Sequence, residues 1–435
     1  MKGEDIIAKQ TKYMIPSTTS GREMIVFVKG KGAVLEDIDG KEYIDCHGGY
    51  SVVNLGHCHP RVVKAIQEQL SSLWHVSWDY YLVPTALLAE KLAKICPGKL
   101  RKSLFCSVGA EAVENAVKLA KKYVVKHYGR GGAQIVSLTG SFHGRTAYAM
   151  ALTGQNKYKQ GLSTYVHPGV VHAPAPYCYR CYYKLTYPEC GLHCAKYMET
   201  LIKYETTGDV AAFISEPILG EGGIVVPPDE YLAEAVKIFR EHDALYIADE
   251  VQTGFGRTGR LFAVEWFNVE PDIMTVAKGI ASGLPLAAAI ATDEVAEAFS
   301  QYDHQSTYGG NALACAAALE NINILLEEKL HERALKSGEI FLEGLGKLAN
   351  KHKLIGDVRG KGLMIGVELV KDRKTKEPAR DEADKLRSEM AKRGVLINTG
   401  GVLSNVVRIQ PPLIITENQI KTVLEKLDLS FKAIS

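Results

Sequence analysis

The chain has 435 residues, 46% of them hydrophobic and 23% charged, which is the composition of a globular protein with room for two domains. Its net charge of +2 includes no dense basic run, so the sequence gives no electrostatic reason to expect a nucleic-acid partner. The apolar runs, such as Leu284–Ala291, are too short to cross a bilayer, and the N-terminus lacks the apolar segment of a signal peptide. We therefore expect a cytoplasmic protein with no membrane partner.

The first 60 residues indicate a hairpin and then a polar loop. Apolar and polar residues alternate over 25–45 around an Asp39-Gly40 turn, which is a hairpin signal. The glycine-rich stretch 48–60 leads into a predicted helix. His57 and His59 lie in this stretch without a distant second pair of ligands, which favours a tight loop over a metal site.

From about residue 84 onward, short apolar runs alternate with helical patterns, as expected for a mostly parallel sheet covered by helices. A long amphipathic helix and then a second domain of mixed character are predicted after this region. The predicted strands cover 104–106, 134–138, 210–214, 244–248, 271–277, 286–291 and 363–370, and the predicted helices begin near 110 or cover 231–242, 312–319 and 320–352, with one more at the C-terminus.

Five of these strands end in or near residues that a ligand site could use. They are Gly109, Phe142, Glu216, Asp249 and Lys278. Because ligands of open α/β sheets bind outside the carboxyl ends of the strands, we expect these residues to meet at one site. Pyridoxal phosphate needs a lysine for its Schiff base and an acid opposite its ring nitrogen, which Lys278 and Asp249 would supply. The structural alternative is an internal ion pair between these two residues.

Two of the strand ends carry further signals. Gly109 stands at the start of a predicted helix, where close backbone approach and free N–H groups favour an anion. Phe142, His143 and Arg145 stand together after strand 134–138, which is typical of a ligand site. The alternative is a loop with a buried phenylalanine and a solvated arginine.

Four of the nine cysteines fall in one short segment, beside His193. They are Cys178, Cys181, Cys190 and Cys194. Their spacing is compatible with a small structural zinc site, with an irregular insert of reduced thiols, or with one redox-active pair. We assign no metal to this segment.

The stretch Asp249-Glu250-Val251-Gln252-Thr253-Gly254-Phe255-Gly256-Arg257-Thr258-Gly259, followed by Lys278-Gly279, resembles the signature of class III pyridoxal-phosphate aminotransferases, the 4-aminobutyrate and ornithine aminotransferase group. The resemblance extends from Gly32 to Pro412 and includes Phe142–Thr146, Glu216-Pro217 with Gly220–Gly222, and Thr307–Asn311. It implies an α/β protein of fold type I, with a large domain around a mainly parallel, seven-stranded type of sheet and a small α+β domain. It also implies a homodimer, or a dimer of such dimers.

Under this resemblance, residues 1–60 contribute to the small domain, 61–320 form the large cofactor-binding domain, and 321–435 complete the small domain. Lys278 would hold the cofactor and move the substrate proton, and Asp249 would keep the pyridine nitrogen protonated. The remaining cofactor contacts implied are Phe142 and Val251 on the ring faces, Gln252 at the phenolic oxygen, Gly109 and Ala110 at the phosphate, Thr307 reaching the phosphate from the partner subunit, and His143 and Glu216 around the ring. The family usually has Asn-Ser where this chain has Ser107-Val108, so one side-chain phosphate contact is in question while the backbone donors remain.

The resemblance also implies a substrate site. Arg145 matches a residue that binds a substrate carboxylate, a task for which the planar guanidinium is suited. Arg408 resembles a second arginine, which pairs with Glu221 while an ω-amino substrate is bound and is freed for the α-carboxylate of glutamate or 2-oxoglutarate. Tyr50 matches a tyrosine that lines the substrate pocket, with ordinary packing as the alternative.

We therefore predict a transaminase that moves an amino group from an ω-amino acid to 2-oxoglutarate by a ping-pong mechanism of two half-reactions. The first alternative is an amino-acid racemase or epimerase on the same fold. The second is a non-catalytic regulator or scaffold that kept the fold, against which the intact Lys278, Asp249 and Gln252 argue.

Overall fold

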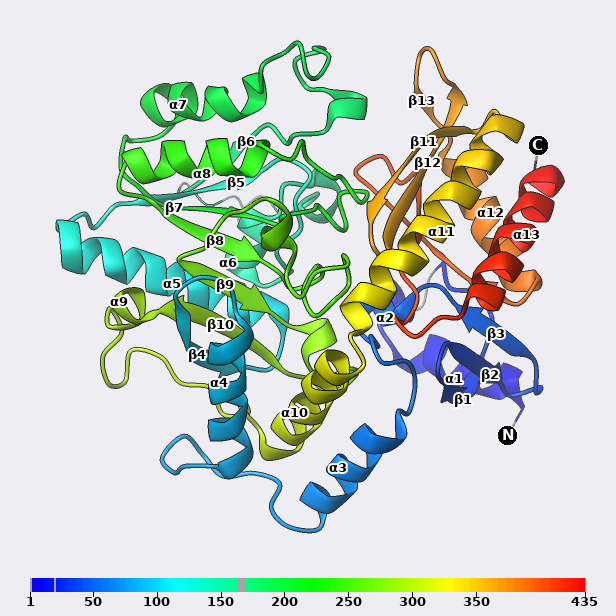
Figure 1. Cartoon of the computed structure of the whole chain (residues 1–435), viewed down its shortest axis with the longest axis horizontal. Coiled ribbons are helices and arrows are strands. Elements are labelled where there is room, and N and C mark those ends of the chain that lie inside the picture. The colour runs from blue at the N-terminus through cyan, green and yellow to red at the C-terminus, as the bar shows by residue number, and fades with distance from the viewer. Residues whose placement is uncertain (1, 19–20, 163–166, 168, 435) are drawn as a thin grey trace.

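Three β-sheets organise the chain, of which the computed structural model describes residues 2–18, 21–162, 167 and 169–434 (Figure 1). The largest sheet has seven strands in the order β4-β10-β9-β8-β7-β5-β6. All its neighbouring strands are parallel except β10, which is antiparallel to both β4 and β9. The prediction of a mainly parallel, seven-stranded sheet is confirmed. The strands are β4 Leu100–Cys106, β5 Gln134–Leu138, β6 Val170–Ala173, β7 Val210–Ser215, β8 Leu245–Asp249, β9 Ile273–Val276 and β10 Ala287–Thr292.

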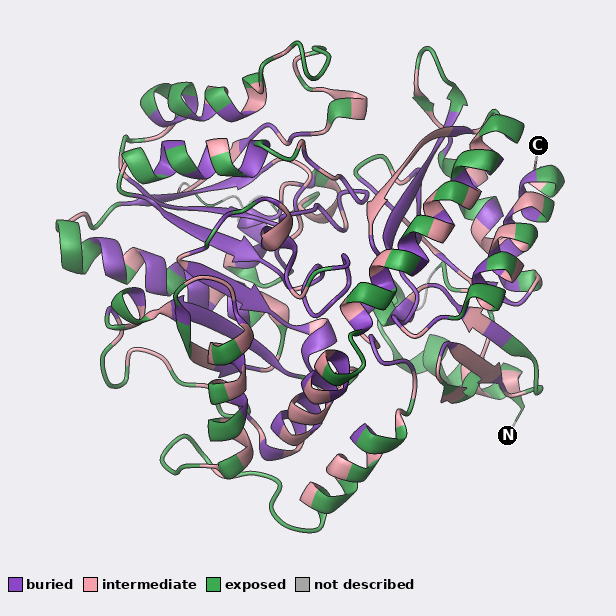
Figure 2. Cartoon of the chain, in the orientation of Figure 1, coloured by how far each residue is buried: buried purple, intermediate pink, exposed green. Residues whose placement is uncertain are grey.

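Helices cover both faces of this sheet, which explains why its strands are apolar at nearly every position. On one face, Ala212 and Ile214 of β7 pack in the same apolar cluster as helix α5 (Gly109–Tyr128). On the other face, Phe213 stacks on Phe239 of helix α8 (Tyr231–Glu241) with ring centroids 4.7 Å apart. Figure 2 shows the strands buried and the exposed residues gathered on the outer sides of the helices.

The two smaller sheets bring the ends of the chain together. The predicted N-terminal hairpin is present as β2 and β3, and Ile44 of β3 pairs in parallel with Val395 of β14, so one sheet holds segments from both ends of the chain. The division of domains at residues 60 and 320 stays a prediction. The strands are β1 Phe27–Lys31, β2 Val34–Asp37, β3 Glu42–Asp45 and β14 Val395–Leu396 in one sheet, and β11 Ile355–Lys361, β12 Met364–Asp372, β13 Glu377–Pro378, β15 Asn398–Gly400 and β16 Val406–Ile409 in the other.

The prediction of one long helix over 320–352 is wrong. The chain instead forms α10 (Ala312–Glu327) and α11 (Leu330–Lys351), separated at Lys329, whose φ of 49° is left-handed. Helix α10 packs on helices of the large-sheet region, whereas α11 packs on β11 and on the C-terminal helix. One straight helix would not reach both surfaces, and the sequence carries no glycine or proline at the break.

The remaining helices lie around these sheets. Within the part of the chain that the structure describes, none is both long and apolar enough to pass through a lipid bilayer. The remaining helices are α1 Gly3–Tyr13, α2 Gly48–Ser51, α3 Pro60–Leu70, α4 Val83–Ile95, α6 Ala147–Leu152, α7 His193–Glu205, α9 Asp293–Ala296, α12 Arg380–Lys392 and α13 Glu417–Ile434.

Candidate active site

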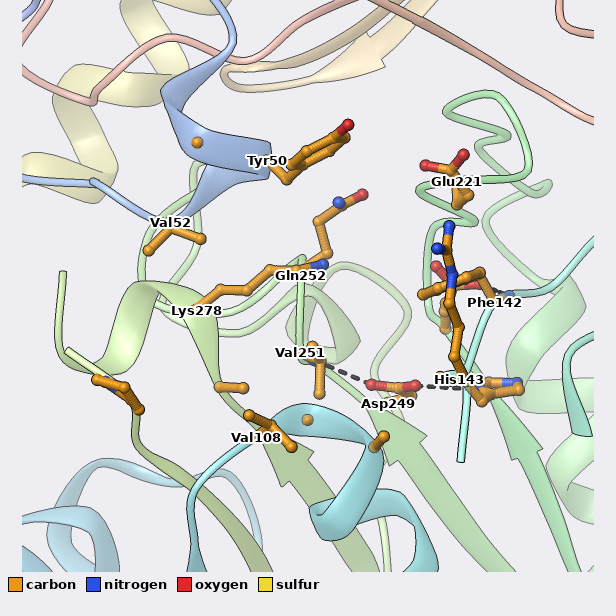
Figure 3. A pocket seen from close by; sticks show the side chains of 18 of the residues that line it. Tyr50, Val52, Val108, Phe142, His143, Glu221, Asp249, Val251, Gln252 and Lys278 are labelled. Atoms are coloured by element: carbon orange, nitrogen blue, oxygen red, sulfur yellow. Dashed lines mark hydrogen bonds and ion pairs between the residues drawn. The ribbon is translucent and has the colours of Figure 1, made fainter. Parts of the chain in front are cut away.

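The carboxyl ends of β5, β7, β8 and β9 open onto one cavity of about 760 Å³ (Figure 3). The five strand-end residues all line it, as the alternation of strands and helices predicts: Gly109, Phe142, Glu216, Asp249 and Lys278. Asp249 and Lys278 form no ion pair with each other, because the Asp249 carboxylate has other partners. The interpretation of these two residues as a plain internal ion pair is therefore wrong.

Asp249 ends strand β8 and is held rigidly on the floor of the cavity. Its Oδ2 accepts a hydrogen bond from Nδ1 of His143 at 2.7 Å, since a carboxylate only accepts. Its Oδ1 accepts from the hydroxyl of Thr275 at 3.0 Å and from the N–H of Val251 at 3.1 Å. These contacts fix the orientation of a buried negative charge that faces the cavity.

Lys278 stands just after β9, at the start of the short 3-10 helix η6 (Lys278–Ile280). Its φ of 45° lies in the left-handed region, which costs about 1 kcal/mol or more for a residue with a side chain. Burial lowers the pKa of its amine, although the nearby Asp249 and Glu216 oppose the shift. A lowered pKa increases the neutral fraction of the amine, which is the form that attacks a carbonyl carbon.

The N-terminus of α5 also lines the cavity, beside Val251 and Ala277. Gly109 and Ala110 both line it, and the first N–H groups of a helix have no partner within the helix. A Cβ on Gly109 would lie 2.9 Å from Cγ1 of Val251, so a larger residue would push the helix end away. Val108 lines the cavity beside them with a side chain that has no hydroxyl, so this position offers an anion only its backbone.

Glu216 and Gln252 shape the side of the cavity. The Glu216 carboxylate accepts from the N–H of Phe142 at 2.9 Å and from the N–H of Gly220 at 2.8 Å, which joins the loops after β5 and β7. Burial raises the pKa of Glu216 to about 7. The Oε1 atom of Gln252 is buried without a hydrogen-bond partner in the described structure. A Cβ on Gly220 would lie 1.8 Å from this atom, so a larger residue there would displace the Gln252 side chain.

The other end of the cavity holds two arginines and one carboxylate. Arg408 of β16 is buried, and its Nη1 lies 2.5 Å from Oε2 of Glu221. The Tyr158 hydroxyl donates to Oε1 of Glu221 at 2.8 Å. The guanidinium of Arg145 lies 4.8 Å from the Tyr158 ring centroid, and that of Arg408 lies 5.8 Å from the ring of Tyr50, which is half-exposed and lines the cavity.

Sequence reasoning missed three residues of this arrangement. Thr275 stands inside a strand, and Lys157 and Tyr158 stand in the 3-10 turn η2 (Asn156–Tyr158), where no local pattern separates them from ordinary loop residues. Conversely, Thr307 is exposed and does not line this cavity. Its contact with the partner subunit's site stays a prediction.

The four clustered cysteines lie away from this site. They line one small cavity with His193 and four tyrosines, and their thiols are free. Within the described ranges, no group of three or more His, Cys, Asp or Glu side chains is placed to hold a metal ion.

The geometry of the large cavity fits pyridoxal phosphate. The glycine at the start of α5 lets an anionic group approach the free N–H groups of the helix, and the Gln252 side-chain amide lines the same cavity and can bond a polar ring substituent. Lys278 and Asp249 line the same space with an amine and a carboxylate. A protein of this fold with these two groups in one cavity is defined as a pyridoxal-phosphate enzyme of fold type I.

Comparison with known proteins gives the family. The family model described as Aminotransferase class-III matches residues 17–431, so the chain belongs to the class III aminotransferases, which depend on pyridoxal phosphate. The chain is 38% identical over 434 residues to acetylornithine aminotransferase from Methanocaldococcus jannaschii, covering 100% of both chains. It is 39% identical over 430 residues to leucine/methionine racemase from Thermococcus litoralis, covering 98% of this chain and 95% of that protein. The structure of an (S)-enantioselective omega-transaminase from Thermomicrobium roseum matches with a TM-score of 0.92 and 35% identity, covering 100% of this chain and 99% of that chain.

Proposed function

We propose that this enzyme transfers an amino group from an ω-amino acid, of the 4-aminobutyrate or ornithine type, to 2-oxoglutarate by a ping-pong mechanism. The observation that carries the proposal is the pairing of Arg408 with Glu221 in the cavity that Arg145 also lines. The guanidinium of Arg145 is therefore open to a substrate carboxylate, whereas that of Arg408 is already paired with Glu221.

Arg145 is the residue that binds the carboxylate common to both substrates. It forms no ion pair with any described carboxylate, and its guanidinium is held over the Tyr158 ring. A free guanidinium in a cavity binds carboxylate bidentately. An ω-amino acid and 2-oxoglutarate each carry a carboxylate far from the reacting carbon, and this carboxylate can bind Arg145 in both cases.

Arg408 is the residue that distinguishes the two half-reactions. While it is paired with Glu221, the positive charge of Arg408 is neutralised, which suits an ω-carbon that bears only an amine and hydrogens. The α-carboxylate of 2-oxoglutarate competes with Glu221 for the same guanidinium. The pair thus lets one cavity accept two substrates of different charge.

The cofactor would be held by groups that already face the cavity. Gly109 and Ala110 would bind its phosphate through backbone N–H groups, Phe142 and Val251 would contact the ring faces, and Gln252 would donate its amide N–H to the phenolic oxygen. Asp249, oriented by His143, would hold a proton on the ring nitrogen. Thr307 would contact the phosphate bound by the partner subunit.

Bound pyridoxal phosphate supplies an electron sink that acidifies the substrate carbon attached to the transferred nitrogen. The amine of Lys278, whose pKa burial lowers, would take the proton from this carbon and carry it during the transfer. The Asp249 carboxylate, whose orientation is fixed by His143 and Thr275, would favour a protonated ring nitrogen. Glu216 holds the Phe142 loop in place during these steps.

The same proposal includes a homodimer, alone or as a pair of dimers. Large apolar side chains are exposed along the segment between α3 and α4, which supports a contact with a second copy. They are Leu70, Leu73, Trp74, Trp78, Tyr80, Tyr81 and Val83. Light scattering after size exclusion tests this, and a monomer at micromolar concentration contradicts it.

Racemisation is the second candidate, because the relative from Thermococcus litoralis is named a leucine/methionine racemase. The holoenzyme incubated with 4-aminobutyrate, ornithine, N-acetylornithine or leucine, each with and without 2-oxoglutarate, separates the two functions. Glutamate formed only when an ω-amine and 2-oxoglutarate are both present supports transamination, with Lys278→Ala as the inactive control. Inverted leucine formed without any keto acid supports racemisation and overturns the proposal.

A further inference from the structure

Glu221 has a second cation beside it that does not line the cavity. The Nζ atom of Lys157 lies 4.0 Å from Oε1 of Glu221, and both side chains are largely shielded, with exposed fractions of 30% and 18%. Lys157 is not one of the residues that line the cavity, whereas Glu221 is. The lysine therefore reaches the carboxylate from the side away from substrate.

The segment after β15 holds this lysine in place. Lys157 Nζ donates a hydrogen bond to the carbonyl of Gly401 at 3.0 Å, and the N–H of Gly401 donates to the backbone carbonyl of Glu221 at 3.0 Å. Gly401 thus connects the ammonium of Lys157 to the backbone of Glu221. The closeness of the ammonium to the Glu221 carboxylate is therefore set by backbone contacts and not only by the two flexible side chains.

The two oxygens of Glu221 have different partners. Oε2 bonds to Arg408, whereas Oε1 accepts from Tyr158 and faces Lys157. Burial by itself would raise the pKa of Glu221, but Arg408, Tyr158 and Lys157 together hold it below the ordinary value. Release of Arg408 to a substrate frees only Oε2, and the Oε1 side keeps its partners.

Release of Arg408 without another cation nearby would leave a shielded carboxylate unpaired. Such a group is costly, because its lost hydration is not replaced. A cation within about 4 Å offsets much of this cost even at an effective dielectric constant of about 20. The cost of freeing Arg408 therefore depends on what remains beside Glu221.

We propose that Lys157 is a positioning residue that compensates the charge of Glu221 when Arg408 turns to a substrate α-carboxylate, and so sets the affinity of the cavity for dicarboxylic acids. This inference rests on the proposed function, which requires Arg408 to be released. Lys157 acts through Glu221 and touches neither substrate nor cofactor.

Binding of glutarate to the holoenzyme, measured by calorimetry, tests the proposal without turnover, because glutarate has both carboxylates of the keto acid and no carbonyl. Butyrate, which has one carboxylate, is the matched ligand. Lys157→Met should weaken glutarate binding about tenfold and change butyrate binding less than about twofold. Lys157→Arg, which keeps the charge, should restore glutarate affinity to within about threefold of wild type. Lys159→Met is the matched control, since Lys159 bonds to the carbonyl of Ala151 and not to Glu221.

A double-mutant cycle decides whether the effect passes through Glu221. In the Glu221→Gln background there is no carboxylate to compensate, so adding Lys157→Met should change glutarate affinity less than about twofold. A crystal structure of the wild-type glutarate complex should show Glu221 separated from Arg408 and closer to Lys157 than the present 4.0 Å.

Equal glutarate affinity in wild type and Lys157→Met overturns this inference and leaves the proposed function standing. An equal loss for glutarate and butyrate, or a full effect of Lys157→Met in the Glu221→Gln background, also overturns it, because either result shows a general structural role. A wild-type protein that binds no glutarate, and forms no glutamate from 2-oxoglutarate, overturns the proposed function and the inference together.

Discussion

Replacing Glu221 by glutamine should make the enzyme bind dicarboxylic acids more tightly. The change removes the charge that holds Arg408 but keeps the shape of the side chain, and the amide oxygen still accepts from Tyr158 or Arg408. In wild type, Nη1 of Arg408 and Oε2 of Glu221 are 2.5 Å apart, with exposed fractions of 1% and 18%. A dicarboxylate must break this pair before it can bind Arg408.

The size of the effect follows from this geometry. Charge centres about 4 Å apart at an effective dielectric constant of about 20 attract by about 4 kcal/mol. Part of that attraction offsets the desolvation of both groups, which leaves a coupling of about 2 kcal/mol. Removing it should strengthen glutarate binding by about 30-fold. The unmasked guanidinium should also raise KM for 4-aminobutyrate a few-fold, since it repels the substrate ammonium.

Calorimetric titration of the holoenzyme with glutarate measures the first effect, and steady-state kinetics with each substrate measure the second. Glu230→Gln is the matched control, because Glu230 is exposed. Among the described residues, its side chain accepts a hydrogen bond only from the Tyr187 hydroxyl. Unchanged or weaker glutarate binding in Glu221→Gln would show that the arginine is not masked by this carboxylate, and the account of dual substrate use would be wrong.

Four further changes test the cofactor site and the core around it. Lys278→Ala should lower turnover by about 1,000-fold or more, and borohydride treatment should no longer attach a pyridoxyl group, as seen by mass spectrometry. Asp249→Asn should lower turnover by about 100- to 1,000-fold with an unchanged circular dichroism spectrum. Gly220→Ala places a Cβ 1.8 Å from Gln252 Oε1, so it should displace that side chain, shift the absorbance maximum of the bound cofactor and lower turnover about tenfold. Burial raises the pKa of Glu250 from 4.5 to about 7. The folded state therefore keeps this proton longer than the unfolded chain, and stability should fall by about 3 kcal/mol as pH rises from 4.5 to 7. Glu250→Gln should remove this part of the slope in denaturant unfolding; an unaltered slope contradicts the assignment.

The sequence by itself predicted six of the seven strands of the large sheet and missed the edge strand β6 (Val170–Ala173). Strand β5 has the predicted bounds, 134–138, where the apolar Ile135, Val136 and Leu138 are followed by Gly140. Gly109, Asp249 and Lys278 were found from the sequence because each stands at the end of a strand or shortly after it, and parallel topology brings strand ends to one edge. Local pattern and one rule of topology brought these residues together, but they did not identify Thr275, which bonds to Asp249.

The pairing of Arg408 with Glu221 was expected from the family resemblance, whereas only the tertiary structure decided the other contacts around Glu221. Tyr158 is 63 residues away from Glu221, and nothing near Lys157 marks it as the neighbour of a carboxylate. The break at Lys329 was likewise hidden, because the amphipathic pattern continues across it and only packing against two different surfaces requires the turn. Periodicity reports which face of a segment is buried, whereas the partner of a buried charge depends on how distant segments pack.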